Sequence, residues 1–162
     1  MIKRIKNYLL RREIKNSAKV KKQFIGWEKV QSAAVIVESE HYAGVKNFIE
    51  QSGKNIDVII FHNDKTSSTP DCFLSVNKKD LNLFDLPKPE VVQKMKRKTY
   101  DVLINTDFSN MAKMRSLTGI MPARCKLGPQ NSSYSDFFDI SIKSSEEEFL
   151  KQALKYLMMI KS

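Results

Sequence analysis

Three short, mostly apolar runs, the first and third followed directly by a segment with helical periodicity, constrain the fold of this chain more than any other feature. They span residues 33–37, 56–61 and 101–106. Apolar runs of this length are typical of strands that are buried on both faces of a sheet. Because these runs alternate with segments that carry apolar residues at helical spacing, they predict a mostly parallel sheet with helices on both faces.

The remaining elements fit the same alternation. Weaker strand patterns lie at residues 72–76, 124–127 and 138–142, and helical patterns lie at 41–51, 87–98, 109–119 and from Ser144 or Ser145 onwards. In the last of these helices, we expect the three glutamates at 146–148 to occupy the first turn, where carboxylates favour the helix dipole. We therefore predict a Rossmann-like α/β fold, a doubly wound and mostly parallel sheet preceded by a basic N-terminal helix. Residues 1–26 would form the helical arm and residues 30–162 the α/β domain.

The segment from residue 1 to residue 22 carries most of the net charge. The whole chain has a formal charge of +10, and this segment contributes nine cations and one anion, Glu13, which leaves 19 cations and 17 anions for the rest of the chain. The nine cations are Lys3, Arg4, Lys6, Arg11, Arg12, Lys15, Lys19, Lys21 and Lys22. A concentration of positive charge on one short segment indicates a polyanionic partner.

The same segment contains no proline or glycine before Gly26, so a helix is predicted over residues 2–24. At 100° per residue its apolar side consists of Ile2, Ile5, Leu9, Val20 and Phe24, while Leu10 and Ile14 lie off this stripe. We expect the two ends of the stripe to be anchored more firmly than its middle. Two arrangements are open, because the helix could pack on the domain or project from it. In either case we expect the domain to fold without residues 1–24.

The loops that follow the strands should carry any catalytic chemistry of such a sheet, and they contain no strong motif. Neither a GxGxxG nor a GxxxxGK[ST] sequence is present. Three weak candidates are His41 and His62 with Glu38 or Asp64, Asp107 with Ser109, and Cys125 after Arg124, which could lower the pKa of the thiol. We interpret Ser109 as a helix N-cap and the histidines as surface residues. We expect no catalytic residue, no cofactor and no metal, and we predict a non-enzymatic protein.

The cysteine spacing and the distribution of apolar residues indicate where the protein is located in the cell. Cys72 and Cys125 lie 53 positions apart in different elements, which is neither a disulfide framework nor a metal-binding spacing, so reduced thiols are expected. No apolar run approaches the ~18 residues of a membrane span, and the N-terminus lacks the apolar region of a secretory signal. We therefore expect a cytoplasmic protein.

Several segments resemble known families. The whole chain resembles a family of short, uncharacterised bacterial proteins that share four features: a basic N-terminal helix, the Lys-Lys-Asp-Leu-Asn segment at 78–82, the YDVLIN strand at 100–105, and a closing F-x-x-x-x-L-x-Y-L pattern at 149–157. Residues 100–105, 112–119 and 123–129 also resemble part of the N-terminal Rossmann-like half of heptosyltransferase-type glycosyltransferases. This second resemblance covers only about residues 99–129. It implies the fold and no catalytic residue, because the first βα loop lacks the glycine-aspartate pair that such enzymes use near the acceptor.

The basic arm suggests the function. Its nine cations can neutralise several phosphates and release their counterions, so we predict a protein that docks on RNA, possibly as a ribosome-associated factor. One alternative is a peripheral membrane protein, in which the same helix meets anionic lipid. Another is a glycosyltransferase-like half-domain that has lost transferase activity or depends on a partner. A plain solvated surface would also account for the charge, and the sequence does not indicate an oligomeric state.

Overall fold

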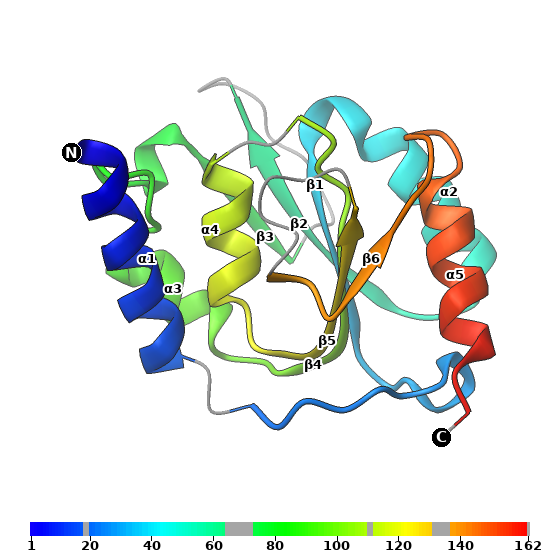
Figure 1. Ribbon diagram of the computed structural model, residues 1–162. Coiled ribbons are helices and arrows are strands. Elements are labelled where there is room, and N and C mark those ends of the chain that lie inside the picture. Colours follow the sequence, from blue (N-terminus) through cyan, green and yellow to red (C-terminus); the bar gives the residue numbers. More distant parts are fainter. Residues whose placement is uncertain (18–19, 64–72, 110–111, 131–136, 162) are drawn as a thin grey trace.

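The computed structural model describes residues 1–17, 20–63, 73–109, 112–130 and 137–161. Six strands form a single sheet in the order β3-β2-β1-β4-β5-β6, and every neighbouring pair is parallel (Figure 1). The strands are β1 (Ala33–Glu38), β2 (Ile56–His62), β3 (Leu74–Asn77), β4 (Tyr100–Asn105), β5 (Ala123–Pro129) and β6 (Ile140–Ile142). This order confirms the predicted doubly wound α/β fold, with the reversal of strand order between β1 and β4.

The centre of the sheet explains why the apolar runs are continuous. All six residues of β1 are buried, and β1 pairs with β2 on one side and with β4 on the other. Ala33 lies opposite Ile56 in β2 and opposite Val102 in β4. A strand that is covered on both faces cannot alternate apolar with polar residues, because each side chain enters one of two cores.

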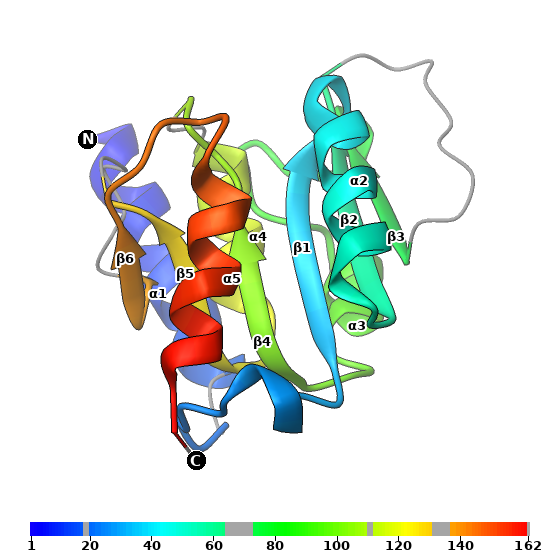
Figure 2. The same ribbon diagram turned by 90° about the vertical axis from the view of Figure 1, so that its right-hand side faces the viewer.

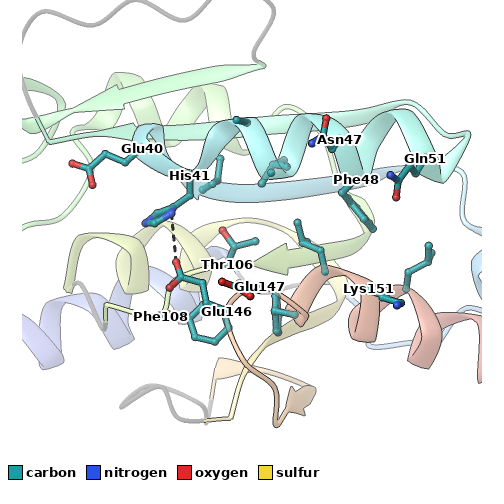
Figure 3. Close-up of a pocket in the computed structure, with 17 residues that line it drawn as sticks. Glu40, His41, Asn47, Phe48, Gln51, Thr106, Phe108, Glu146, Glu147 and Lys151 are labelled. Carbon is teal, nitrogen blue, oxygen red and sulfur yellow. Dashed lines mark ion pairs between the residues drawn. The ribbon is translucent and has the colours of Figure 1, made fainter.

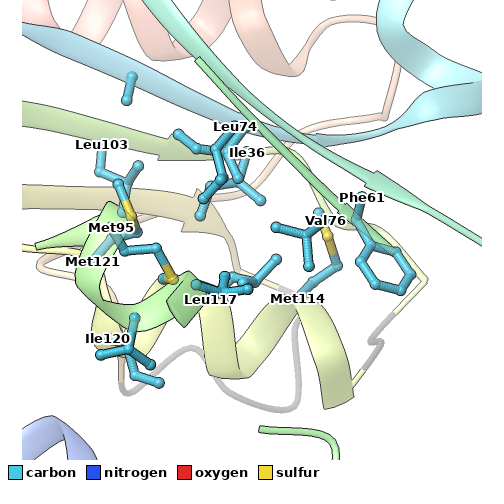
Figure 4. Close-up of a cluster of buried hydrophobic side chains, with 14 of the residues drawn as sticks. Ile36, Phe61, Leu74, Val76, Met95, Leu103, Met114, Leu117, Ile120 and Met121 are labelled. Atoms are coloured by element: carbon cyan, nitrogen blue, oxygen red, sulfur yellow. The ribbon is translucent and has the colours of Figure 1, made fainter. Parts of the chain in front are cut away.

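Helices cover both faces of the sheet, as Figures 1 and 2 show. One face carries α1, α3 and α4, and the other carries α2, α5 and the short helix η1. The helices are α1 (Ile2–Ser17), η1 (Trp27–Lys29), η2 (Ser39–His41), α2 (Tyr42–Ser52), η3 (Lys78–Asp80), α3 (Pro89–Met95), α4 (Ala112–Ile120) and α5 (Phe149–Met159). On the first face, Met114, Leu117 and Ile120 of α4 pack with residues of the strands and with Met95 of α3 (Figure 4).

The N-terminal helix packs on the domain and does not project from it. Leu10 is only 1% exposed and belongs to the hydrophobic core between the sheet, α3 and α4, with Ile14 packed against it. Gly119 leaves room for this contact, because a Cβ atom at that position would lie 2.6 Å from Cδ1 of Ile14 and the Ile14 side chain would have to shift. Two polar contacts anchor the N-terminal half of α1. Lys6 Nζ lies 2.8 Å from Oδ2 of Asp85, and Nη2 of Arg115 donates to Oδ1 of Asn7.

The packing face of α1 differs from the predicted apolar stripe. Leu10 and Ile14, which lie off that stripe, contact the core, as does Leu9 from the middle of the stripe. Ile2 and Phe24 at its ends are instead 67% and 55% exposed. The prediction was wrong for two reasons. Helix α1 ends at Ser17, so Val20 and Phe24 do not belong to its surface. Within the helix, the contact with α4 buries the side that carries Leu10 and Ile14, and helical periodicity does not show which side a distant element covers. Removing residues 1–24 would also take Leu10 out of the core, so the shortened protein should be less stable than the full chain.

Residues 20–26 have no regular secondary structure and run along the amino-terminal edge of the sheet to η1 on the opposite face (Figure 1). The backbone N–H of Gln23 donates to the carbonyl of Arg124 at the start of β5. Lys22 Nζ lies 3.1 Å from Oδ2 of Asp139. The N-terminal part of the chain, from α1 to η1, therefore contacts both faces of the sheet.

Several predicted boundaries shift. Helix α5 begins at Phe149, so the glutamates at 146–148 precede the helix and do not occupy its first turn. Helix α4 begins at Ala112 and does not include Ser109, the expected N-cap. Cys72, the first residue of the predicted third strand, lies outside the described residues. Among the described residues, no helix is both long and apolar enough to cross a membrane.

A buried lysine joins β5 to the end of α4. Lys126 Nζ donates to the carbonyls of Thr118 and Gly119 at 2.8 and 3.1 Å, where the last carbonyls of α4 lack helical partners. Burial, followed by the nearby positive charge of Lys22, lowers the pKa of Lys126 from 10.5 to about 7, while Asp139 acts in the opposite direction. The ammonium form is therefore disfavoured in the folded protein.

This burial predicts a pH dependence of stability. Above about pH 7 the folded state releases the Lys126 proton, whereas the unfolded chain holds it up to about pH 10.5. The unfolded state then binds more protons, so the free energy of unfolding should rise between pH 7 and 8.5, with a slope of up to about 1.4 kcal/mol per pH unit from this group. Urea unfolding of Lys126→Met should show a flatter profile over the same range. If both proteins show the same slope, Lys126 does not titrate as proposed.

A second prediction concerns the docking of α1. Leu10→Ala should lower the free energy of unfolding by about 3 kcal/mol, because it removes a buried side chain and leaves a cavity. Ile2→Ala in the same helix is the matched control and should change the free energy by less than about 0.5 kcal/mol, because Ile2 is exposed. Urea titration measures both. Equal effects of the two substitutions would show that α1 is not part of the cooperative fold.

Candidate functional site

The outward face of α1 carries a continuous basic stripe. Arg4, Tyr8, Arg11 and Lys15 recur at helical spacings of four, three and four residues, which places them on one side of the helix. All four are exposed, and Tyr8 retains 65% of its accessible surface. This side is rotated by roughly 110° about the helix axis from Leu10 and Ile14, which contact the core. The stripe therefore presents three cations and one aromatic ring to solvent along about 16 Å of helix, at ~1.5 Å per residue.

The structure separates the nine predicted polyanion-binding residues into three groups. Six are exposed and make no ion pair among the described residues: Lys3, Arg4, Arg11, Arg12, Lys15 and Lys21. Lys6 and Lys22 instead form ion pairs within the protein, with Asp85 and Asp139. Lys19 lies outside the described residues. The available charge is therefore concentrated on the exposed side of α1.

A groove of about 430 Å³ runs beside this stripe. Leu9 and Arg12 line it from α1, and Pro89, Val92 and Gln93 line it from α3, which shows that the two helices are neighbours across the groove. Between them lies the ring of Phe84, from the segment that precedes α3. The sequence did not indicate this groove, because Phe84 lies 75 positions from Leu9 and no local pattern links them.

A second basic cluster lies at the carboxyl end of α3. Lys94 lies in the last turn of α3, and Lys96 and Arg97 follow directly; all three are exposed. Lys98 is instead paired with Asp57, at 2.9 Å between Nζ and Oδ2. Because α3 forms one wall of the groove, exposed cations are present on both helices that border it.

A separate cleft of about 780 Å³ lies on the opposite face of the sheet, between α2 and α5. It opens at the carboxyl ends of β1 and β4, where the strand order reverses and where ligands bind in folds of this type. Its apolar lining includes Phe48 of α2, Phe108 after β4, and Phe149 of α5, and the rings of Phe108 and Phe149 meet edge to face at 5.4 Å.

Acidic side chains and a histidine lie at one end of this cleft (Figure 3). His41 Nδ1 lies 3.4 Å from Oε1 of Glu146, which joins the start of α2 to the segment before α5. Ligand atoms of Glu38, Glu40 and His41 lie within 4.8 Å of one another, although the buried Glu38 also accepts a hydrogen bond from Nδ2 of Asn63. The sequence predicts the glutamates at 146–148 in the first turn of a helix, whereas the structure brings Glu146 to His41, a contact that no local pattern indicates.

The other candidates from the sequence lie in different environments. His62 is 1% exposed, so it is not the surface residue that we had expected, whereas His41 is exposed as predicted. Asp107 is equally buried, and its Oδ1 accepts a hydrogen bond from the backbone N–H of Ser109. Asp64 lies outside the described residues. The two histidines therefore differ in environment, and His41 borders the cleft between α2 and α5.

Cys125 has the opposite of an activated environment. It is a free cysteine, fully buried in β5. Burial, followed by the negative charge of Asp139, raises the pKa of its thiol to about 12, against a smaller opposite effect of Lys22. The neighbouring Arg124 does not act on the thiol as the sequence had suggested, because its guanidinium lies 3.8 Å from Oδ1 of Asp101 instead. A thiol in this state is a packing residue and not a nucleophile.

Comparison with known proteins gives one match. No curated protein and no solved structure matches the chain. A family model described as "Family of unknown function (DUF6913)" matches residues 3–160. This range includes the basic helix α1, the groove beside it, the whole sheet and the cleft between α2 and α5. The chain therefore belongs to DUF6913, a family of unknown function.

Proposed function

We propose that this protein binds single-stranded RNA on the surface formed by α1 and the groove between α1 and α3. The observation that carries the proposal is the basic stripe of Arg4, Arg11 and Lys15 on the outward side of a docked helix. Cations on such a stripe neutralise successive phosphates and release condensed counterions, which supplies affinity without sequence specificity. Arginine adds bidentate hydrogen bonds to phosphate oxygens.

A helix that is packed on the domain should bind RNA more tightly than a disordered arm with the same charges. A disordered basic segment would lose conformational entropy when it bound RNA. Helix α1 is already held by Leu10 in the core and by the pair between Lys6 and Asp85. Its exposed cations are therefore in place before the RNA arrives, and less of the binding free energy is spent on ordering the chain.

The groove accounts for a preference for single strands. Tyr8 is exposed within the stripe, and Phe84 lies in the neighbouring groove together with Leu86 and Pro87. Unpaired bases stack on aromatic side chains, while the bases of a duplex are already stacked on each other. The backbone of a single strand would follow the cations of α1 while one or more bases enter the groove.

The charge contribution is tested by salt dependence. If about five cations contact phosphates, the logarithm of affinity should fall against the logarithm of salt concentration with a slope of about −3.5 on single-stranded RNA. Replacing Arg4, Arg11 and Lys15 with Gln should reduce this slope to about −1.4 and weaken binding to unrelated sequences alike. Fluorescence anisotropy on two unrelated oligonucleotides measures both effects.

The control is a charge-matched triple variant away from the stripe, with Lys46, Lys143 and Lys155 replaced by Gln. It removes the same net charge and should leave the slope unchanged. If both triple variants lose the same amount of RNA affinity, binding follows the net charge of the protein and not the stripe. The proposal is refuted if the wild-type protein binds RNA with a dissociation constant above about 10 μM at low salt.

Binding to an anionic membrane surface must be distinguished from binding to RNA. The exposed Ile2 and Ile5 would enter a bilayer boundary, so Ile2→Ser with Ile5→Ser should release the protein from anionic vesicles if lipid is the partner. RNA binding should change little in this variant, because neither residue carries charge. The RNA proposal is overturned if the wild-type protein sediments with anionic vesicles but does not bind RNA, and if the double variant no longer sediments with the vesicles.

The stacking contribution has its own test. Phe84→Leu keeps an apolar side chain in the groove but removes the ring, so the fold should be retained. Binding of single-stranded RNA should weaken by about 1 kcal/mol or more, whereas the salt slope should not change. An unchanged affinity would show that the groove does not accept a base.

A further inference from the structure

The cleft between α2 and α5 lies on the opposite face of the sheet from α1, and the proposed RNA surface makes no use of it. Its volume of about 780 Å³ falls within the range of small-molecule sites, and it lies at the reversal of strand order. The apolar lining contributed by Phe48, Phe108 and Phe149 suits a ligand with an apolar or aromatic body.

The charged side chains that line the cleft indicate the charge of the ligand that would fit it. Three carboxylates line it, those of Glu40, Glu146 and Glu147, although the chain as a whole carries a net charge of +10. Within the described part of the chain, Glu146 pairs with His41, while Glu40 and Glu147 make no ion pair. Carboxylates at this edge repel the phosphate groups of nucleotides and attract a positively charged group.

Lys151 limits the number of charges on the ligand. Figure 3 shows Glu40, His41 and Glu146 at one end of the cleft and Lys151 with Gln51 at the other. A ligand with an ammonium group at each end would place one of them near Lys151, where like charges repel. The lining therefore favours one positive charge, held at the carboxyl edge of the sheet, and an apolar body that extends between the two helices.

We infer that this cleft binds a small primary monoamine with an apolar body, the ammonium group held at the end that Glu40, Glu146 and Glu147 line and the body packing on Phe48, Phe108 and Phe149. The ammonium donates to the carboxylate oxygens, and the pair of His41 and Glu146 closes the same end of the cleft. A divalent metal ion would use the carboxylates but would leave the aromatic lining without a role.

The experiment compares ligands that share one ring and differ in charge. Phenethylamine carries an ammonium group and phenylacetate a carboxylate, and each is titrated into the full-length protein while amide shifts are followed by NMR, with EDTA present to remove metal ions. Phenethylamine should bind in the millimolar range and shift the amides of Phe48, Thr106 and Lys151, and phenylacetate should bind at least fivefold more weakly. 1,4-Bis(aminomethyl)benzene keeps the ring and carries a second ammonium group, so it tests the limit set by Lys151 and should also bind more weakly than phenethylamine.

Variants locate the site. Glu40→Gln with Glu147→Gln should weaken phenethylamine binding about fivefold or more, because it removes the carboxylates that make no ion pair in the described structure and leaves the pair of His41 and Glu146 intact. Glu50→Gln with Glu90→Gln removes two exposed carboxylates outside the cleft and should have no effect. The inference is overturned if phenylacetate or the diamine binds as tightly as phenethylamine, if phenethylamine does not bind, or if both double variants lose affinity equally.

Discussion

The contact between α1 and α4 is the interaction on which the account of this protein depends. Gly119 leaves room for the side chain of Ile14, and Leu10 of the same helix is buried in the core on one face of the sheet. Without this contact, the nine cations of the N-terminal segment would belong to a mobile tail. With it, a rigid helix turns one side to the core and presents Arg4, Arg11 and Lys15 on another. The charge asymmetry seen in the sequence thus becomes a defined surface.

The sheet separates two surfaces of opposite character. Helices α1 and α3 lie on one face with exposed cations and a small groove, whereas α2 and α5 lie on the other face and border a cleft with three glutamates. The cleft follows from topology, because the reversal of strand order between β1 and β4 separates the helices that flank it. The basic surface follows from the docking of the N-terminal segment, which crosses the amino-terminal edge of the sheet. Each surface therefore has its own structural cause.

The sequence predicted most of the fold and only part of either site. Buried parallel strands leave a strong local signal, as in residues 33–37, so the sheet was correctly predicted. The packing face of α1 was not, because Leu10 is buried by α4, which lies more than 100 positions away. The same reason explains why the groove at Phe84 and the approach of Glu146 to His41 were missed. These contacts join segments that are distant along the chain, and periodicity reports only on neighbours.

Native-state hydrogen exchange of α1 tests the central claim most directly, because it distinguishes a docked helix from a mobile arm without any ligand. The account predicts that the backbone amides of residues 9–14 exchange slowly in the free protein, at rates comparable with those of α4, because both helices open together. Leu10→Ala should accelerate exchange in both helices. Exchange of residues 9–14 at the rate of an unstructured chain, while α4 stays protected, would contradict the account.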